Sequence, residues 1–348
     1  SPRTAALRAF EELPRELWAD AVRPVLAKAS AARAGDLVNL LGRDATGAAL
    51  LREAADGGAK IAALVEKAAQ RREAIDVDVA EEPLVLPPFE VLPDVPAGQA
   101  VIDELRTRLA GEIARGEASD QAWARNNAAR ARKIADADLV EFVAVANGEG
   151  KRSKLLREFN TWWLSDAVPS LTLVHLLRLR RIENSRHLSG VIGMRVDATT
   201  DLRTIEDAVR RAGVHTDQIG ANGLDDEAIA DYGVGWYRAD LDPEVTWPWF
   251  AEHPAILPEW LRGEAPKVTA ALGVLAHFPR IPADVVPLVA QVALSESRTN
   301  RPLAQAALTS HPAALALATQ GLTDGKGEIR AAAAGWIARQ GSPDGIAP

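Results

Sequence analysis

The sequence predicts an all-α protein built from helical hairpins, and three observations lead to this prediction. Alanine, leucine and arginine, which are strong helix formers, dominate the composition. Only one short run, residues 190–196, has the character of a strand. Near the C-terminus, three segments with the same order of basic, small and aliphatic residues follow one another at similar spacing. A chain of this kind buries its apolar surface by packing helix against helix.

Composition sets limits on the function. The 348 residues are enough for two ordinary domains or one elongated array. The net charge of -8 disfavours a role in coating nucleic acid along the whole chain, although a local basic surface remains open. The chain has no cysteine, which excludes disulfides, thiolate metal sites and cysteine nucleophiles.

The sequence carries no sign of a membrane segment. Its longest apolar runs, such as Leu171–Leu177, are far shorter than the roughly 20 residues that cross a bilayer. The first residue is Ser1, which suggests either a piece cut from a longer protein or a processed chain, so that a targeting segment could have been lost. We expect a cytoplasmic location and no membrane partner.

The N-terminal region, residues 1–79, is predicted to be helical. Its helical stretches are 4–29, interrupted at Pro14 and Pro24, then 36–41 and 46–74. A proline-rich linker or strap follows at 80–97, where five prolines fall within the sixteen residues of Glu81–Pro96. Because proline removes a backbone donor and blocks a helix interior, this strap should be extended.

The middle region, residues 98–230, returns to helical patterning. The helices expected around it are 97–116, 119–135, 136–147, 151–164, 168–182 and 201–213. Residues 231–250 are rich in aromatic and turn-forming side chains, which predicts an irregular packed connector.

The last region, residues 231–348, is predicted to contain helical repeats. Three segments align on Lys267, Arg301 and Arg330, which are 34 and then 29 residues apart. The third position after each is an alanine and the seventh an aliphatic residue, namely Ala270, Ala304 and Ala333, then Val274, Leu308 and Ile337. This spacing is typical of stacked helical hairpins, in which small side chains let neighbouring helices approach closely. We expect the array to continue beyond the final repeat, because a solenoid end needs a cap.

These segments resemble known helical repeats. The unit "LTDGKGEIRAAAAGWIARQGSPDGI" is similar to a HEAT repeat, which implies a HEAT-like α-solenoid. The runs "VTWPWFAEHPAILPEWL", "HFPRIPADVVPLVAQVAL" and "NRPLAQAAL" resemble the internal helical region of large bacterial MolR-like proteins. The likeness covers about the last hundred residues. It brings no catalytic motif with it.

A basic and aromatic region lies between residues 120 and 195. It holds 13 Lys/Arg against 8 Asp/Glu, a local charge of +5. Such a surface could contact the phosphates of an anionic partner, or it could be a solvated helix face with tryptophans buried in the core. The candidate binding residues are Lys151, Arg152, Lys154, Arg157, Trp162, Trp163, Arg178, Arg180, Arg181 and Arg186.

Catalytic motifs are incomplete. The loop "NGEGKRSK" has Val145 where a phosphate-binding loop needs glycine, and Arg152 where it needs serine or threonine. The six histidines show no metal-ligand spacing, and no Gly-x-Ser-x-Gly elbow is present. We therefore predict no catalytic residue, cofactor or metal.

Two functions remain open. The first is a non-enzymatic scaffold or recognition module that binds a protein partner, or other domains of the same parent chain, through a solenoid surface. The second is a nucleic-acid-binding protein, regulatory or related to DNA repair, that uses the 120–195 region. HEAT-like folds also form alkylpurine glycosylases, which grip duplex DNA with a basic concave face.

Overall fold

In a computed structural model, the described part of the chain is helical. It comprises residues 83–159, 168–182, 195–214 and 242–341, with single positions elsewhere. Those single positions are Pro14, Leu17, Asp20, Pro24, Ala49, Arg52, Ala62, Ala63, Glu66, Trp163 and Ile229. Within this part no residue is in a strand, so the predicted all-α class is confirmed.

The chain divides into two compact units. One is Leu86–Ile256, and the other is Leu257–Pro348 together with Ser1–Val85. The helices expected in residues 1–79 lie outside the described residues, apart from the single positions. The strand expected at 190–196 also lies mostly outside them, and its last two residues, Arg195 and Val196, are not in a strand.

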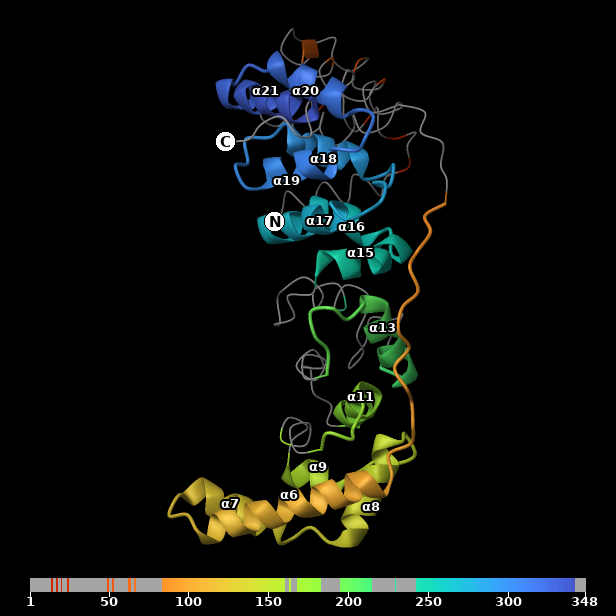
Figure 1. The fold of residues 1–348 in the computed structure, drawn as a ribbon, viewed down its shortest axis with the longest axis vertical. Coiled ribbons are helices and arrows are strands. Elements are labelled where there is room, and N and C mark those ends of the chain that lie inside the picture. The colour runs from red at the N-terminus through yellow and green to blue at the C-terminus, as the bar shows by residue number, and fades with distance from the viewer. Residues whose placement is uncertain are drawn as a thin grey trace. The chain divides into compact units, whose positions relative to one another are not determined.

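After the strap, the first unit continues with a helical hairpin and then shorter helices (Figure 1). Its helices are α6 (Gln99–Glu117), α7 (Ala122–Ala131), α8 (Asp136–Ala146), α9 (Lys154–Glu158), α11 (Leu173–Ile182), α13 (Leu202–Arg211) and α15 (Pro243–Glu252). Helix α6 packs along α7, and α8 contacts α6, α9 and α11. Leu105, Phe142 and Leu155 are completely buried where these helices meet, because their apolar faces exclude water there.

Helix α15 corrects the prediction of an irregular connector at 231–250. Residues from Pro243 onward are helical, although Pro248 lies inside the helix. Asp242 accepts a hydrogen bond from the backbone N–H of Glu244, and Pro243 occupies the first turn, where a missing N–H costs nothing. Trp249 and Phe250 are completely buried, so packing stabilises a helix that the local sequence disfavours.

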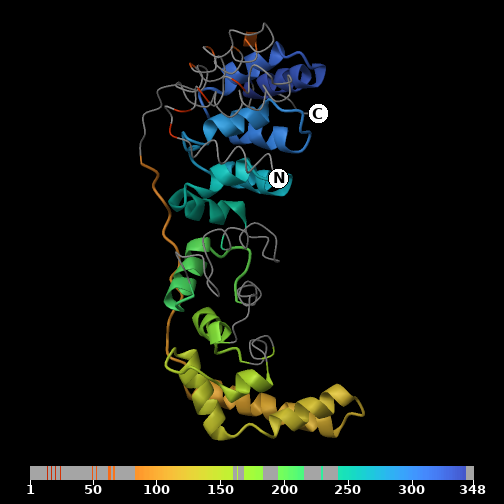
Figure 2. The same ribbon diagram turned by 180° about the vertical axis from the view of Figure 1, so that it is seen from behind.

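The proline-rich strap is not helical at any described position, 83–97. Within the first unit it runs past α13 and α11 to the C-terminal end of α8, as both ribbon views show (Figures 1 and 2). Most side chains of the strap are exposed, Val91 and Val95 among them, whereas Leu86 and Leu92 are half-buried and Ala97 is buried. The strap therefore lies against the first unit at a few apolar positions.

The second unit contains the three segments that align in the sequence. Its helices are α16 (Ile256–Leu261), α17 (Ala265–Leu275), α18 (Val286–Ala293), α19 (Asn300–Ala307), α20 (Ala314–Leu322) and α21 (Gly327–Gly341). Helices α18 and α19 pack against each other as a hairpin, as do α20 and α21. Helix α17 packs on α19, so two of the three aligned segments are direct neighbours (Figure 1).

Side chains of the aligned positions lie at the helix contacts. Ala304 and Ala333 are buried, and Ala270 is half-buried. Of the aliphatic positions, Val274 and Leu308 are buried and Ile337 is half-buried. Polar bonds also link the second helices: Thr269 Oγ1 of α17 lies 2.7 Å from Asn300 Oδ1 of α19, and Arg339 Nη2 of α21 lies 2.7 Å from Gln305 Oε1 of α19. Ala304 and Ala333 are therefore shielded from solvent, and Ala333 lies beside Gly321 of α20.

None of the helices in the described residues has the length and apolar character needed to span a bilayer.

Candidate functional site

The predicted basic residues after α8 form a short exposed group. Lys151, Arg152 and Arg157 are exposed. Ser153 places them, because its hydroxyl accepts a hydrogen bond from the backbone N–H of Leu156 and so begins α9. Three cations thus lie close together along the chain and accessible to solvent.

Two other predicted cations are held by acidic partners. Lys154 Nζ lies 3.0 Å from Asp138 Oδ2. Both terminal nitrogens of Arg178 contact the Asp94 carboxylate, at 3.0 and 2.9 Å. Paired guanidinium and carboxylate groups of this kind are charge-assisted and geometrically specific. These two side chains therefore serve contacts within the unit.

Trp163 packs at the edge of the core. Its ring stacks on Phe159 with centroids 4.2 Å apart, and its indole N–H lies 3.4 Å from Glu112 Oε1. The guanidinium of Arg108 lies 5.4 Å from the same ring. Trp162 and Arg186 lie outside the described residues, and of Arg180 and Arg181 only the helical backbone is described.

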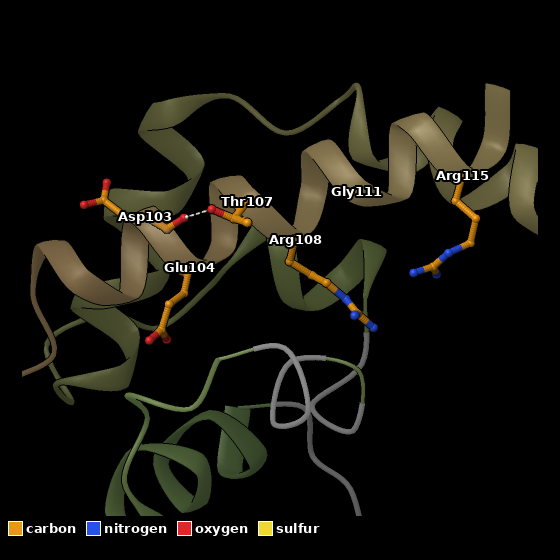
Figure 3. Close-up of a pocket in the computed structure, with 6 residues that line it drawn as sticks. All are labelled: Asp103, Glu104, Thr107, Arg108, Gly111 and Arg115. Carbon is orange, nitrogen blue, oxygen red and sulfur yellow. Dashed lines mark hydrogen bonds between the residues drawn. The ribbon is translucent and has the colours of Figure 1, made fainter. Parts of the chain in front are cut away.

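A hollow of about 500 Å³ lies along α6 (Figure 3). The described residues that line it are Asp103, Glu104, Thr107, Arg108, Gly111 and Arg115, all from this one helix. Glu104 and the two arginines point to the same side of the helix. Glu104 also accepts hydrogen bonds from the hydroxyl and backbone N–H of Ser170, at 2.6 and 3.2 Å.

The charges around the hollow centre on buried Glu112. Only 1% of this side chain is exposed, and its Oε1 lies 2.7 Å from Arg115 Nη1 and 3.7 Å from Arg108 Nε. Its Oε2 is buried with no hydrogen-bond partner among the described residues. With Asp103 and Glu104 in the lining, the hollow and Glu112 together hold two arginines against three carboxylates, so this open surface carries charges of both signs.

The sequence interpretation missed this cluster. Glu104, Arg108, Glu112 and Arg115 are spaced by four, four and three residues, so a helix places them on one face. That spacing was the available signal. It does not show which charge is buried, because burial depends on tertiary contacts such as that of Glu112 with Trp163, 51 residues away.

A second buried carboxylate, Glu206, joins α13 to α15. Trp249 Nε1 donates to Glu206 Oε2 at 2.7 Å, His253 Nε2 lies 3.5 Å from the same oxygen, and Arg210 bonds to Oε1. The His253 ring stacks on Trp249 with centroids 4.0 Å apart. Burial alone would raise the pKa of Glu206. The bonds from His253 and Trp249 and the charge of Arg210 outweigh that effect and lower the pKa below its ordinary 4.5.

This lowered pKa predicts acid sensitivity of the first unit. The unfolded chain takes up the Glu206 proton first, so the stabilisation is complete above the ordinary pKa and is lost as pH falls through the folded value. We expect the urea concentration at the unfolding midpoint to decrease as the pH is lowered below about 4.5. In Glu206→Gln this decrease should be smaller. Unfolding curves at successive pH values measure this. The exposed Glu244→Gln control should keep the wild-type slope, and an equal slope in all three proteins would contradict the assignment.

Neither the described residues nor comparisons with known proteins point to a particular metal or cofactor. Among the described residues, no group of three or more His, Asp or Glu side chains is placed to hold a metal ion. No protein-family model, curated protein or solved structure matches the chain. The chemistry of these surfaces therefore has to be inferred from their own side chains.

Proposed function

We propose that this chain is a non-enzymatic scaffold or recognition module that binds a protein partner through its helical hairpins. The observation that supports the proposal is the close packing of the hairpins through small side chains. At Gly321 in α20, an added Cβ would lie 2.6 Å from the Ala333 Cβ of α21 and 2.9 Å from Leu294 Cδ2. Hairpins that repeat such contacts place their outer helices in a row, which is how helical repeat proteins form extended binding surfaces.

We further propose that this arrangement is a HEAT-like α-solenoid related to the helical region of MolR-like proteins. Support comes from the aligned residues Ala304 and Ala333, both buried, and from the packing of α17 on α19. The other domains of a parent chain are included among the protein partners.

An apolar strip on α20 is the part of the hairpins best suited to a protein partner. Leu315 is 55% exposed and Leu322 is 39% exposed. Residues seven apart lie on the same face of a helix, so the two side chains form one strip. The neighbouring Ala316 and Thr319 are also exposed, so that a partner helix could approach closely.

Cross-linking mass spectrometry on protein from the native host tests the proposal. We expect one reproducible partner cross-linked next to α20, and its loss in the double variant Leu315→Ser/Leu322→Ser. Thr319→Ser on the same helix is the control and should keep the partner. If the double variant keeps the wild-type Tm and still cross-links to the same partner, the α20 surface is refuted. Measurable catalytic turnover without any partner would refute the recognition function.

The second candidate function is nucleic-acid binding, favoured by the exposed group Lys151, Arg152 and Arg157. Contacts to phosphate weaken steeply with salt because they release counterions. Fluorescence polarisation with labelled duplex and single-stranded DNA should then show binding at low salt. This binding should disappear when Lys151, Arg152 and Arg157 are all changed to glutamate. No binding at low salt would eliminate this candidate.

A further inference from the structure

The strap is held in the first unit as a bound peptide would be. Among the described residues, positions 83–97 make no hydrogen bond between backbone groups. Helical side chains contact it instead. Arg203 Nη2 donates to the carbonyl of Pro87 at 2.9 Å, and Thr204 Oγ1 donates to that of Glu90 at 2.6 Å.

Further along, two contacts are bidentate. Arg178 of α11 forms its paired bonds with Asp94. Asn147, the C-cap of α8, accepts from the backbone N–H of Ala97 at 2.7 Å and donates to its carbonyl at 3.1 Å. We call Arg203, Thr204, Arg178 and Asn147 the ladder. Gly148 follows Asn147 with φ of +84°, which ends α8. The side-chain amide of Asn147 then lies at the end of the helix, where it binds the strap.

The spacing of the ladder matches an extended peptide. Its contacts fall at strap positions 87, 90, 94 and 97, in the order α13, α11, α8. An extended chain advances about 3.1–3.3 Å per residue, so three or four residues span roughly 10 Å. Packed helices lie about 8–10 Å apart. The first two contacts come from neighbouring residues of α13, and from Glu90 onward successive helices meet the extended chain every three to four residues.

The contacts also define the chemistry of the ligand. Bonds to backbone carbonyls, and to both backbone groups of a single residue, require an accessible extended chain but no particular side chain. Arg178 requires a carboxylate, and the guanidinium of Arg203 lies 5.0 Å from the ring centroid of Phe89, which favours an aromatic residue. The half-buried Leu86 and Leu92 add apolar contacts. Prolines between these positions keep the peptide extended at little entropic cost.

We propose that the ladder is a binding site for extended, proline-rich acidic peptides, and that the strap is its occupant in this structure. A partner segment of the same chemistry binds by replacing the strap. The strap is suited to replacement because few groups hold it, and because Val91 and Val95 remain 58% and 62% exposed. This site is distinct from the α20 strip and does not depend on it.

A fluorescent peptide with the sequence of residues 84–97 tests the site. The protein is the full chain in which strap residues 86–96 are replaced by glycine and serine at equal length. We expect saturable binding to this protein, and binding at least about tenfold weaker to the wild-type chain, whose tethered strap competes at high effective concentration.

Ladder variants in the strap-replaced chain make the test specific. Arg178→Gln and Asn147→Ala should each weaken the peptide about tenfold or more. Arg125→Gln, an exposed cation outside the ladder, should leave the affinity unchanged. No binding to a strap-replaced chain with wild-type circular dichroism, or binding equally tight in all variants, would overturn the proposal.

A second variant covers the case in which the strap-replaced chain does not fold. Asp94→Lys keeps every helix and the strap length but places a cation against Arg178. It should loosen the resident strap and raise the peptide affinity severalfold above that of the wild-type chain. An affinity no higher than wild type in folded Asp94→Lys would also overturn the proposal.

Discussion

Gly116→Ala should destabilise the protein by about 1–3 kcal/mol, although alanine is the better helix former in isolation. Gly116 lies in α6 where α7 crosses closely. An added Cβ would lie 2.7 Å from the carbonyl oxygen of Ala124 and closer still to the Ala128 Cβ. Backbone cannot move aside as a flexible side chain can, so the two helices must separate and lose packing along their whole contact.

Gly111→Ala is the matched control on the same helix. No atom lies within 4 Å of its added Cβ, so this variant should be stabilised by up to about 1 kcal/mol. Urea unfolding followed by circular dichroism measures both. The second unit offers the same pair: Gly321→Ala should destabilise, whereas Gly273→Ala, with open space around it, should not. Stabilisation by all four alanines would show that close helix approach does not control packing.

Trp249→Phe should cost about 2–4 kcal/mol, more than the same substitution at Trp336. Both tryptophans are almost fully buried. The indole N–H of Trp249 donates to buried Glu206 at 2.7 Å, and phenylalanine would leave that carboxylate one donor short. A buried charged group that loses a hydrogen-bond partner lowers the free energy of unfolding, because no water replaces the lost bond.

Trp336→Phe is the comparison, because its indole N–H has no hydrogen-bond partner among the described residues. It should lose about 1 kcal/mol from reduced volume, partly offset by removal of an unsatisfied donor. Urea unfolding of both variants measures the difference, and hydrogen exchange assigns it to a unit. Equal losses would mean that the Glu206 bond contributes nothing. Trp249→Phe should also make the first unit less dependent on pH.

Local patterns predicted those parts of the fold that depend on near neighbours in sequence. The helix expected at 136–147 is α8, Asp136–Ala146, and that expected at 201–213 is α13, Leu202–Arg211. The prolines of the strap exclude helix wherever it is described. The burial of Ala304 and Ala333 also follows from their period, because a repeated small residue marks one helix face.

The sequence by itself therefore determined the all-helical class, the extended strap and the small-residue faces, since each depends on backbone preferences or periodicity within a few residues. Only the tertiary structure decided which charged side chains bind a partner within the protein. Arg178 meets Asp94, 84 residues away, and Arg203 meets Pro87, 116 residues away. Folding alone brings such groups together, and the same long-range packing stabilises α15 despite Pro248. The ladder is invisible in the linear chain because its residues share a surface and not a motif.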